Sequence, residues 1–357
     1  MGQGDTDVSN PSDPVTGETL LALARTGDRP AFDTVVAPYL GELRAHCYRM
    51  LGSPMDAEDA LQESLLGAWR GLTGFAGRSS LRTWLYRIAT NACTRIASQR
   101  PPRLLSIDRA RPNPDVHAIG EFIADSGWLE PYPGPLVDEA VASTSPEGRA
   151  LAVESLELAF VAALQHLPAT QRAALILRDV LAFPAAEVAD MLETSVPATN
   201  SLLQRARSTM SLRAPERSQQ ATLDALGNAR QRDLVDALVT AWEHGDVDAI
   251  VGLLVEDARF TMPPIPAWFD GRAAIEHFLR VRMFETPWRF DPTMANGQLA
   301  FACYQWRAGE PGESEGMAFR LSAINLLTLR GDRIVEIAGF LDRGVFVHFG
   351  FPAEHPT

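Results

Sequence analysis

Apolar residues recur at helical spacing along the first part of the chain. Between residues 18 and 100 they fall three and four positions apart, which predicts several amphipathic helices. The stretch from 101 to 150 loses this period and carries repeated proline and glycine, so we expect a linker there. Helical spacing returns at Leu151 and continues to Arg213. The pattern therefore predicts two helical units joined by a tether.

The last third of the chain has a different pattern of apolar residues. Helical patterning is expected near 229–256 and 271–283, followed by alternating apolar segments at 318–329 and 334–341 with a turn between them. This order predicts an α+β domain. The chain is accordingly expected to be multidomain, with a flexible N-terminal tail at 1–25, an all-α unit at 26–100, an acidic proline-rich linker at 101–150, a second all-α unit at 151–215 and the α+β domain at 228–350.

Charge is unevenly distributed. The net charge of −13 opposes approach to nucleic acid, because phosphate contacts need clustered cations. From Arg82 to Arg111, however, seven arginines stand against one aspartate, whereas Pro112 to Pro146 holds six acids and no base. Nucleic-acid binding by the arginine-rich segment is therefore compatible with an acidic chain.

Composition also bears on metal binding, membrane insertion and the cellular compartment. The three cysteines lie far apart and form no CxxC pair, which argues against a disulfide framework or a zinc knuckle and predicts no metal and no cofactor. No apolar run approaches the roughly 20 residues of a membrane span, and the N-terminus is polar and acidic. We expect a cytoplasmic protein without a membrane partner.

An acidic stripe lies within the first helical unit. Asp56, Asp59 and Glu63 follow the spacing i, i+3, i+7, so they share one helical face, while Leu61 and Leu65 occupy another. An ordinary solvated face would look the same. The residues that follow favour a functional interpretation.

The segment from Phe75 to Cys93 combines a glycine-containing loop with a helix. Leu81, Leu85 and Ile88 predict its core stripe, and an adjoining face carries Trp84, Arg87 and Asn91. An aromatic ring, a cation and an amide together suit unpaired or extruded bases, which need stacking, phosphate neutralisation and edge hydrogen bonds.

The acidic stripe, the "FAGRSSLRTWLYRIATNAC" segment and the arginines after it resemble region 2 of extracytoplasmic-function sigma factors. The resemblance implies that the stripe binds the β′ clamp of core RNA polymerase and that the loop and helix open the −10 promoter element. It assigns polymerase binding to Asp56, Asp59, Gln62 and Glu63. It assigns −10 DNA binding to Phe75, Arg78, Ser79, Ser80, Trp84, Arg87 and Asn91.

A second motif runs from Leu167 to Arg207 and reads as three helices with a short break before the third, as in a helix-turn-helix. Ser195 is the expected N-cap of the third helix, with Pro197 in its first turn. This motif is similar to region 4 of the same family, which reads the −35 element of double-stranded promoter DNA and docks on the β flap of polymerase. The side chains expected to face outward are Asn200, Ser201, Gln204 and Arg205, with Arg207 at the boundary.

Residues 230 to 352 look similar to the SnoaL-like (nuclear-transport-factor-two-like) fold, an α+β cone. Such cones usually enclose an apolar pocket, which admits a small apolar ligand as a partner. The aromatic tail from Val345 to Phe351 is a further expectation, as an edge that docks on the helical units. The residues expected to line the pocket or the core are Trp242, Phe260, Met262, Trp268, Phe278, Trp288 and Asn325.

The sequence therefore predicts an alternative sigma factor, not an enzyme, whose C-terminal domain regulates it in cis. Two alternatives remain open at this point. The cone could be a small-molecule isomerase or cyclase, with His244, His277 or His348 as its base. The chain could instead be a helix-turn-helix repressor, for which the acidic stripe would have no use.

Overall fold

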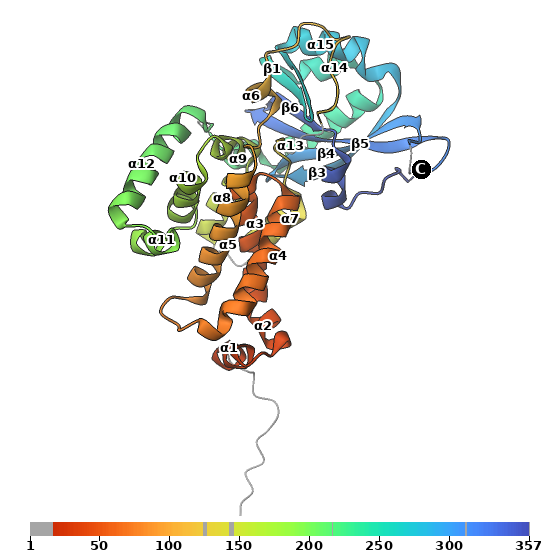
Figure 1. Cartoon of the computed structure of the whole chain (residues 1–357). Coiled ribbons are helices and arrows are strands. Elements are labelled where there is room, and N and C mark those ends of the chain that lie inside the picture. The colour runs from red at the N-terminus through yellow and green to blue at the C-terminus, as the bar shows by residue number, and fades with distance from the viewer. Residues whose placement is uncertain (1–16, 124–126, 143–145, 216, 311–312, 357) are drawn as a thin grey trace, which may run out of the picture.

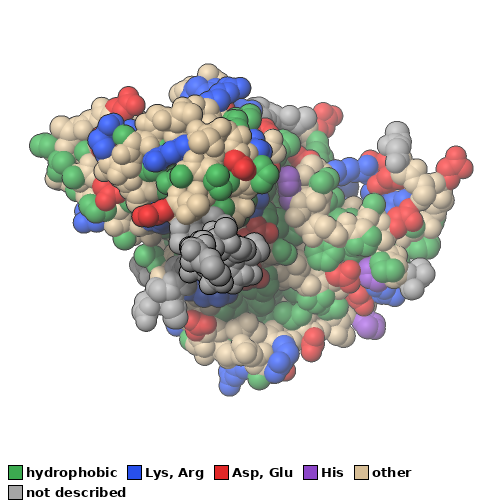
Figure 2. Space-filling view, turned by 90° about the horizontal axis from the view of Figure 1, so that it is seen from below, with side chains coloured by type: hydrophobic (Ala, Val, Ile, Leu, Met, Phe, Trp, Pro, Cys, Tyr) green, Lys and Arg blue, Asp and Glu red, His purple; other side chains and the backbone are tan. Residues whose placement is uncertain are grey.

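The computed structural model of the chain describes residues 17–123, 127–142, 146–215, 217–310 and 313–356. Three bodies are visible: a helical unit at the lower centre, a second helical unit beside it and an α+β domain above (Figure 1). Seen from below, acidic and basic side chains are interspersed over the surface, so the negative charge is not gathered in one patch on that face (Figure 2).

Short polar residues begin and end the helices of the first unit. Gly52 takes a left-handed conformation (φ 72°) and ends one helix, and Ser53 caps the next by accepting from Asp56 N–H at 3.2 Å. Ser80 caps the following helix in the same way, accepting from Thr83 N–H at 3.0 Å. The helices are α1 (Gly17–Arg25), α2 (Arg29–Val36), α3 (Leu40–Leu51), α4 (Pro54–Gly71) and α5 (Leu81–Gln99), with 3₁₀ turns at Ala37–Tyr39 and Leu72–Gly74.

Two segments that the sequence predicts to be flexible are ordered where the structure describes them. Residues 17–25, assigned to the tail, form α1 and bury Ala24; residues 1–16 lie outside the described part of the chain. The linker contains α6 (Ser106–Arg109) and α7 (Gly134–Val141), and it buries Leu129 and Tyr132 completely. Contacts with distant parts of the chain, which periodicity does not report, fix both segments.

The second helical unit contains the predicted helix-turn-helix. A π-helical turn at Ile176–Val180 follows the first of its three predicted helices, and Ala182 in the turn before the next helix has a left-handed backbone (φ 57°). The helices are α8 (Pro146–Glu154), α9 (Leu158–Gln165), α10 (Ala169–Leu175), α11 (Ala185–Met191) and α12 (Val196–Arg213).

The α+β domain is a six-stranded sheet with strand order β2-β1-β6-β5-β4-β3, in which β1 runs parallel to β6 and the other neighbours are antiparallel. The strands are β1 (Leu254–Met262), β2 (Ile265–Asp270), β3 (Trp288–Ala295), β4 (Gln298–Ala308), β5 (Met317–Arg330) and β6 (Arg333–Phe340). One face packs against α13 (Gln219–Glu243), which is kinked at Gly227, and against α14 (Val247–Gly252) and α15 (Arg272–Val281). A 3₁₀ turn at Met283–Glu285 precedes β3.

The opposite face of this sheet meets the helical units. Ala295, Ala300, Leu326 and Phe340 belong to the same apolar cluster as residues of α3, α9 and the linker. The tail, which contains α16 (Arg343–Phe346) and a 3₁₀ turn at Val347–Phe349, buries Val345 and Phe346 mainly against the domain's own β4 and β5. The sheet, and not the tail, therefore makes most of the apolar contact with the helical units, so the tail is not the docking edge that the sequence predicts.

Candidate polymerase and promoter interface

The acidic stripe on α4 is only partly exposed. Asp59, Gln62 and Glu63 lie at the surface, and Glu63 forms an exposed ion pair with Arg95 of α5. Asp56 is different, because only 3% of the residue is exposed. The exposed acidic ridge thus consists of Asp59, Gln62 and Glu63, and the prediction of an exposed Asp56 is wrong.

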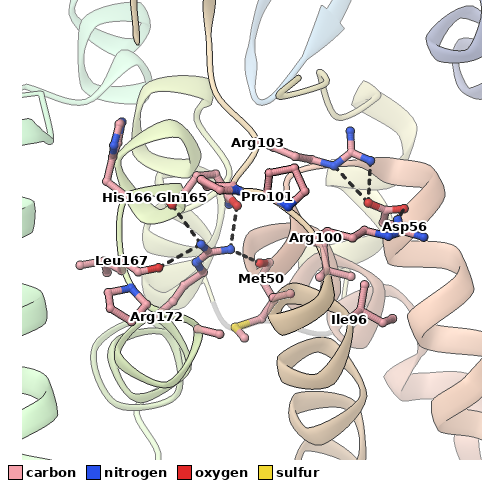
Figure 3. Close-up of a pocket in the computed structure, with 15 residues that line it drawn as sticks. Met50, Asp56, Ile96, Arg100, Pro101, Arg103, Gln165, His166, Leu167 and Arg172 are labelled. Atoms are coloured by element: carbon pink, nitrogen blue, oxygen red, sulfur yellow. Dashed lines mark hydrogen bonds and ion pairs between the residues drawn. The ribbon is translucent and has the colours of Figure 1, made fainter. Parts of the chain in front are cut away.

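Asp56 is buried because two linker-proximal arginines hold its carboxylate. Arg103 donates from Nη2 at 2.6 Å and from Nε at 3.0 Å, and Arg100 pairs with the other oxygen (Figure 3). Arg103 also contacts Glu130 Oε1 at 2.6 Å and Trp128 O at 2.8 Å. Burial raises the pKa of Glu130, an effect that Arg103 opposes. Arg103, near the beginning of the linker, therefore joins the start of α4 to the middle of the linker.

The surface predicted to bind the −10 element gathers around one cavity of about 170 Å³. Phe75 and Trp84 are each 8% exposed, and their rings pack at a tilt of 37° with the centroids 5.0 Å apart, so neither ring offers an open face on which a base could stack. Arg78, Ser79 and Arg87 also line this cavity. Ser80 and Asn91 are exposed outside the lining, where Ser80 caps α5.

Helix α11 of the second helical unit covers part of this surface. Asp190 and Met191 line the same cavity as Trp84, and Thr83 Oγ1 donates to Glu187 Oε2 at 2.8 Å. Two aromatic contacts reinforce the junction: the Arg82 guanidinium lies 4.7 Å from the ring centroid of Phe183, and Tyr86 meets the same ring edge-on at 5.2 Å. The two predicted DNA-reading units are thus packed against each other.

The face of α12 predicted to read the −35 element is open. Ser195 caps the helix as expected, and Thr199, Leu203 and Ala206 face the core. Helix α12 lies at the outer edge of the molecule (Figure 1). Arg207 already has a partner, since it donates to both oxygens of Asp179 at 2.6 and 2.8 Å. The exposed residues are Asn200, Ser201, Gln204, Arg205 and Arg207.

The aromatic residues expected in the C-terminal domain are buried and packed together. Trp242 lies 5.0 Å from Phe290 and 6.4 Å from Phe260, and Phe260 lies 5.5 Å from Phe278. Trp288 and Met262 belong to the same core. Asn325 is buried on β5, two residues from Ala323 and two from Leu327, which both belong to that core. Trp268 is the exception, because its indole N–H donates to Ala110 O of the linker at 2.9 Å. Its prediction as a lining residue is therefore wrong.

The three histidines named as candidate bases are not gathered around the core of this domain. His244 and His277 are exposed, and His244 Nδ1 contacts Thr240 O of its own helix at 2.7 Å. His348 lies partly buried in the tail. In the described part of the chain, no three His, Cys, Asp or Glu side chains come together as a metal site would need.

The β3–β4 turn inserts between the helical units. Asn296 is fully buried with a left-handed backbone (φ 55°), and its side chain accepts from Tyr132 N–H at 2.7 Å. The same amide donates to Tyr48 Oη at 2.9 Å and to Leu156 O at 2.7 Å. One side chain thus contacts α3, the linker and the segment before α9. Sequence reasoning missed it, although Asn-Gly between two strands is a hairpin signal.

A buried cation joins the two helical units. Arg172 of α10 donates to Gln165 O and Leu167 O, both at 3.1 Å, and also to Met50 O of α3 (Figure 3). Burial lowers its pKa to about 10, so the side chain stays charged at neutral pH. It lines a cavity of about 310 Å³ between these units, together with Arg100 and Arg103.

Models of known protein families match three parts of the chain. The model of sigma-70 region 2 matches residues 35–100, the model of sigma-70 region 4 matches 157–210, and the SnoaL-like domain matches 235–337. The fold is therefore that of a sigma factor with a C-terminal SnoaL-like domain. The chain belongs to the extracytoplasmic-function (ECF) sigma factors and directs transcription initiation.

Similar proteins support the assignment along most of the chain. ECF RNA polymerase sigma factor SigG of Mycobacterium tuberculosis is 42% identical over 333 residues, covering 92% of this chain and 85% of that protein. The ECF sigma-E factor of Escherichia coli is 29% identical over 197 residues, 55% of this chain and 93% of that protein. The crystal structure of M. tuberculosis SigJ shares the fold, with a TM-score of 0.55 at 21% identity, covering 90% of this chain and 99% of that one.

Sigma factors bind core RNA polymerase and promoter DNA, which fits the two regions found here. The repressor and bifunctional-enzyme alternatives are not supported, since the similar proteins are sigma factors. Among the described helices, none combines the length and the apolar character that a bilayer crossing requires.

Proposed function

We propose that this sigma factor adopts a closed state in which region 4 covers the −10 surface of region 2 and the C-terminal domain holds the two regions together. The contact between Thr83 and Glu187 carries the proposal, because it places α11 beside Trp84 and Arg87. Asn296 supports it by bridging both regions and the linker. In this state the −10 element cannot reach the surface around Trp84 and Arg87, while α12 remains accessible to DNA.

In the open state, the exposed ridge of Asp59, Gln62 and Glu63 would contact the β′ clamp, and region 4 would dock on the β flap. Region 2 would then open the −10 element with the Phe75–Ser80 loop and α5, and α12 would read the −35 element through Gln204 and Arg205. Amide and guanidinium groups on such a helix can hydrogen-bond base edges in the major groove. Transcription would take place in the cytoplasm, with the C-terminal domain as a regulator and not a catalyst.

Charge reversal of the ridge tests the polymerase contact. Asp59→Arg with Glu63→Arg should weaken binding to core polymerase at least about tenfold and leave the fold intact, because both residues are exposed and the Glu63–Arg95 pair contributes little. Glu18→Arg with Asp33→Arg is the control matched in charge, since both residues are exposed outside α4 and Asp33 pairs with the neighbouring Arg29 of its own helix. Equal affinity of both variants in a core-binding titration would refute the ridge assignment.

The closed state is tested by Glu187→Arg in the full chain. The change removes the acceptor of Thr83 and places a second guanidinium near Arg82, so the contact between α5 and α11 becomes repulsive. We expect promoter-dependent transcription in vitro at limiting core polymerase to rise about tenfold, as for a shift of about 1.4 kcal/mol. Glu193→Arg, an equal charge change at an exposed residue after α11, should leave transcription unchanged. An unchanged rate for Glu187→Arg would contradict the closed state.

A further inference from the structure

The linker between regions 2 and 4 doubles back on itself. Leu104 and Trp128 form a parallel bridge, in which Leu104 N–H donates to Gly127 O at 2.9 Å and Leu129 N–H donates to Leu104 O at 3.1 Å. The Arg109 guanidinium stacks over the Trp128 ring at 4.2 Å. The chain therefore enters and leaves a loop at nearly the same point.

The described part of this loop lies along edge strand β2 of the C-terminal domain. Asn113 N–H donates to Trp268 O at 2.8 Å, and the Trp268 indole returns a bond to Ala110 O at 2.9 Å. Farther along, Ile123 N–H donates to Pro264 O at 3.2 Å. Two main-chain bonds ten residues apart thus hold the loop to β2 and to the turn before it, and main-chain bonding to a sheet edge is a recurring mode of peptide recognition.

Apolar side chains anchor the loop between these bonds. Val116 is 4% exposed within the core cluster of the C-terminal domain, and Ile119 packs partly against the same cluster. Ser106 Oγ donates to Ile265 O at 3.1 Å at the start of the loop. Phe122 is 55% exposed, so the contact selects particular side chains and does not simply cover apolar surface.

The closed loop shortens the distance that the linker can span between regions 2 and 4. Because the loop ends meet, the 24 residues that follow Leu104, up to and including Trp128, add nothing to the span of the linker, yet extended they would add up to about 80 Å. The −10 and −35 elements lie about 25 base pairs apart, which is about 85 Å along B-DNA. Regions 2 and 4, in contact through Thr83 and Glu187, must separate by tens of ångströms to reach both elements.

We propose that the β2 edge of the C-terminal domain is a binding surface for this linker loop, and that the bound loop limits the separation of regions 2 and 4. Full promoter binding then requires the loop to leave β2 and its base to open. This inference rests on the proposed closed state, and it adds the element through which the C-terminal domain acts.

A reversible lock on the loop base tests the proposal. In the full chain, Leu104→Cys with Trp128→Cys places two thiols at the bridged positions, while the native cysteines are all buried. The oxidised protein should bind core polymerase and lose at least about tenfold of its promoter-dependent transcription, and reductant should restore it. Single-cysteine variants and the wild type should not respond to oxidant. Full transcription by the oxidised double variant would overturn the proposal.

A second pair of variants tests the surface itself. Val116→Ser with Ile119→Ser should speed hydrogen exchange of the Asn113 and Ile123 amides at least about tenfold, whereas Phe122→Ser, the loss of a large apolar side chain at an exposed position of the same loop, should not. Unchanged exchange in the double variant would show that β2 does not hold the loop. If Glu187→Arg activates transcription while the oxidised lock stays active, the loop proposal fails and the closed state stands.

Discussion

Replacing Asn296 with alanine should loosen the joint between the C-terminal domain and both sigma regions. The change removes the partners of Tyr132 N–H and Leu156 O, which are buried at the joint, and puts alanine at a left-handed position. Together these effects should make local opening about 3 kcal/mol easier, which corresponds to roughly 100-fold faster exchange of amides protected only by the closed joint.

The amide of Leu158 is a suitable reporter, because it donates to Gln298 Oε1 at 2.9 Å beside the Asn296 turn. Asp332→Ala, at the exposed turn between β5 and β6, is the matched control and should leave this exchange rate unchanged. Equal protection of Leu158 in Asn296→Ala and the wild type would show that the turn does not hold the joint.

Replacing Arg103 with methionine should have the second large effect. Asp56 would keep only the half-exposed Arg100, and Glu130 would lose its ion pair. Breaking a buried pair by removing one partner costs about 3–5 kcal/mol, because the remaining charge stays buried. The free energy of unfolding of the full chain, from urea titration, should fall by about this amount.

The pH dependence provides an internal check. Arg103 opposes the raised pKa of Glu130, so its loss should raise that pKa further. A raised pKa of an acid in the folded state gives stability that is lost as pH increases, so the deficit of Arg103→Met should grow as pH rises above the ordinary glutamate pKa of about 4.5. Arg100→Met, at a half-exposed arginine, is the control and should cost about 1 kcal/mol or less. Equal losses for the two arginines would contradict the buried network.

Local patterns predicted the elements and motifs well. The helix-turn-helix followed from apolar spacing and from the capping residue Ser195, and both sigma regions were recognised from contiguous residues. These features depend on neighbours within one or two turns. The α+β class of the last domain followed from the change from helical to alternating spacing.

Contacts between distant segments could not be predicted. Helical spacing placed Asp56 with Asp59, but Arg103, 47 residues away, buries it. The register of β2 points Ala267 and Phe269 inward and therefore turns Trp268 towards the linker, and sequence alone did not fix that register. The contact of α11 with α5 has no signature in either helix, because each surface is also compatible with solvent.

Regions 2 and 4 are proposed to contact each other in the free chain and to separate on the promoter. Spin labels at two exposed positions, Thr73 after α4 and Ala186 on α11, would measure this separation by pulsed dipolar spectroscopy. We predict one short distance in the free full-length chain and a distance longer by at least about 40 Å in the complex with core polymerase and promoter DNA. The same distance in both states, or a free chain already at the long distance, would contradict the closed state.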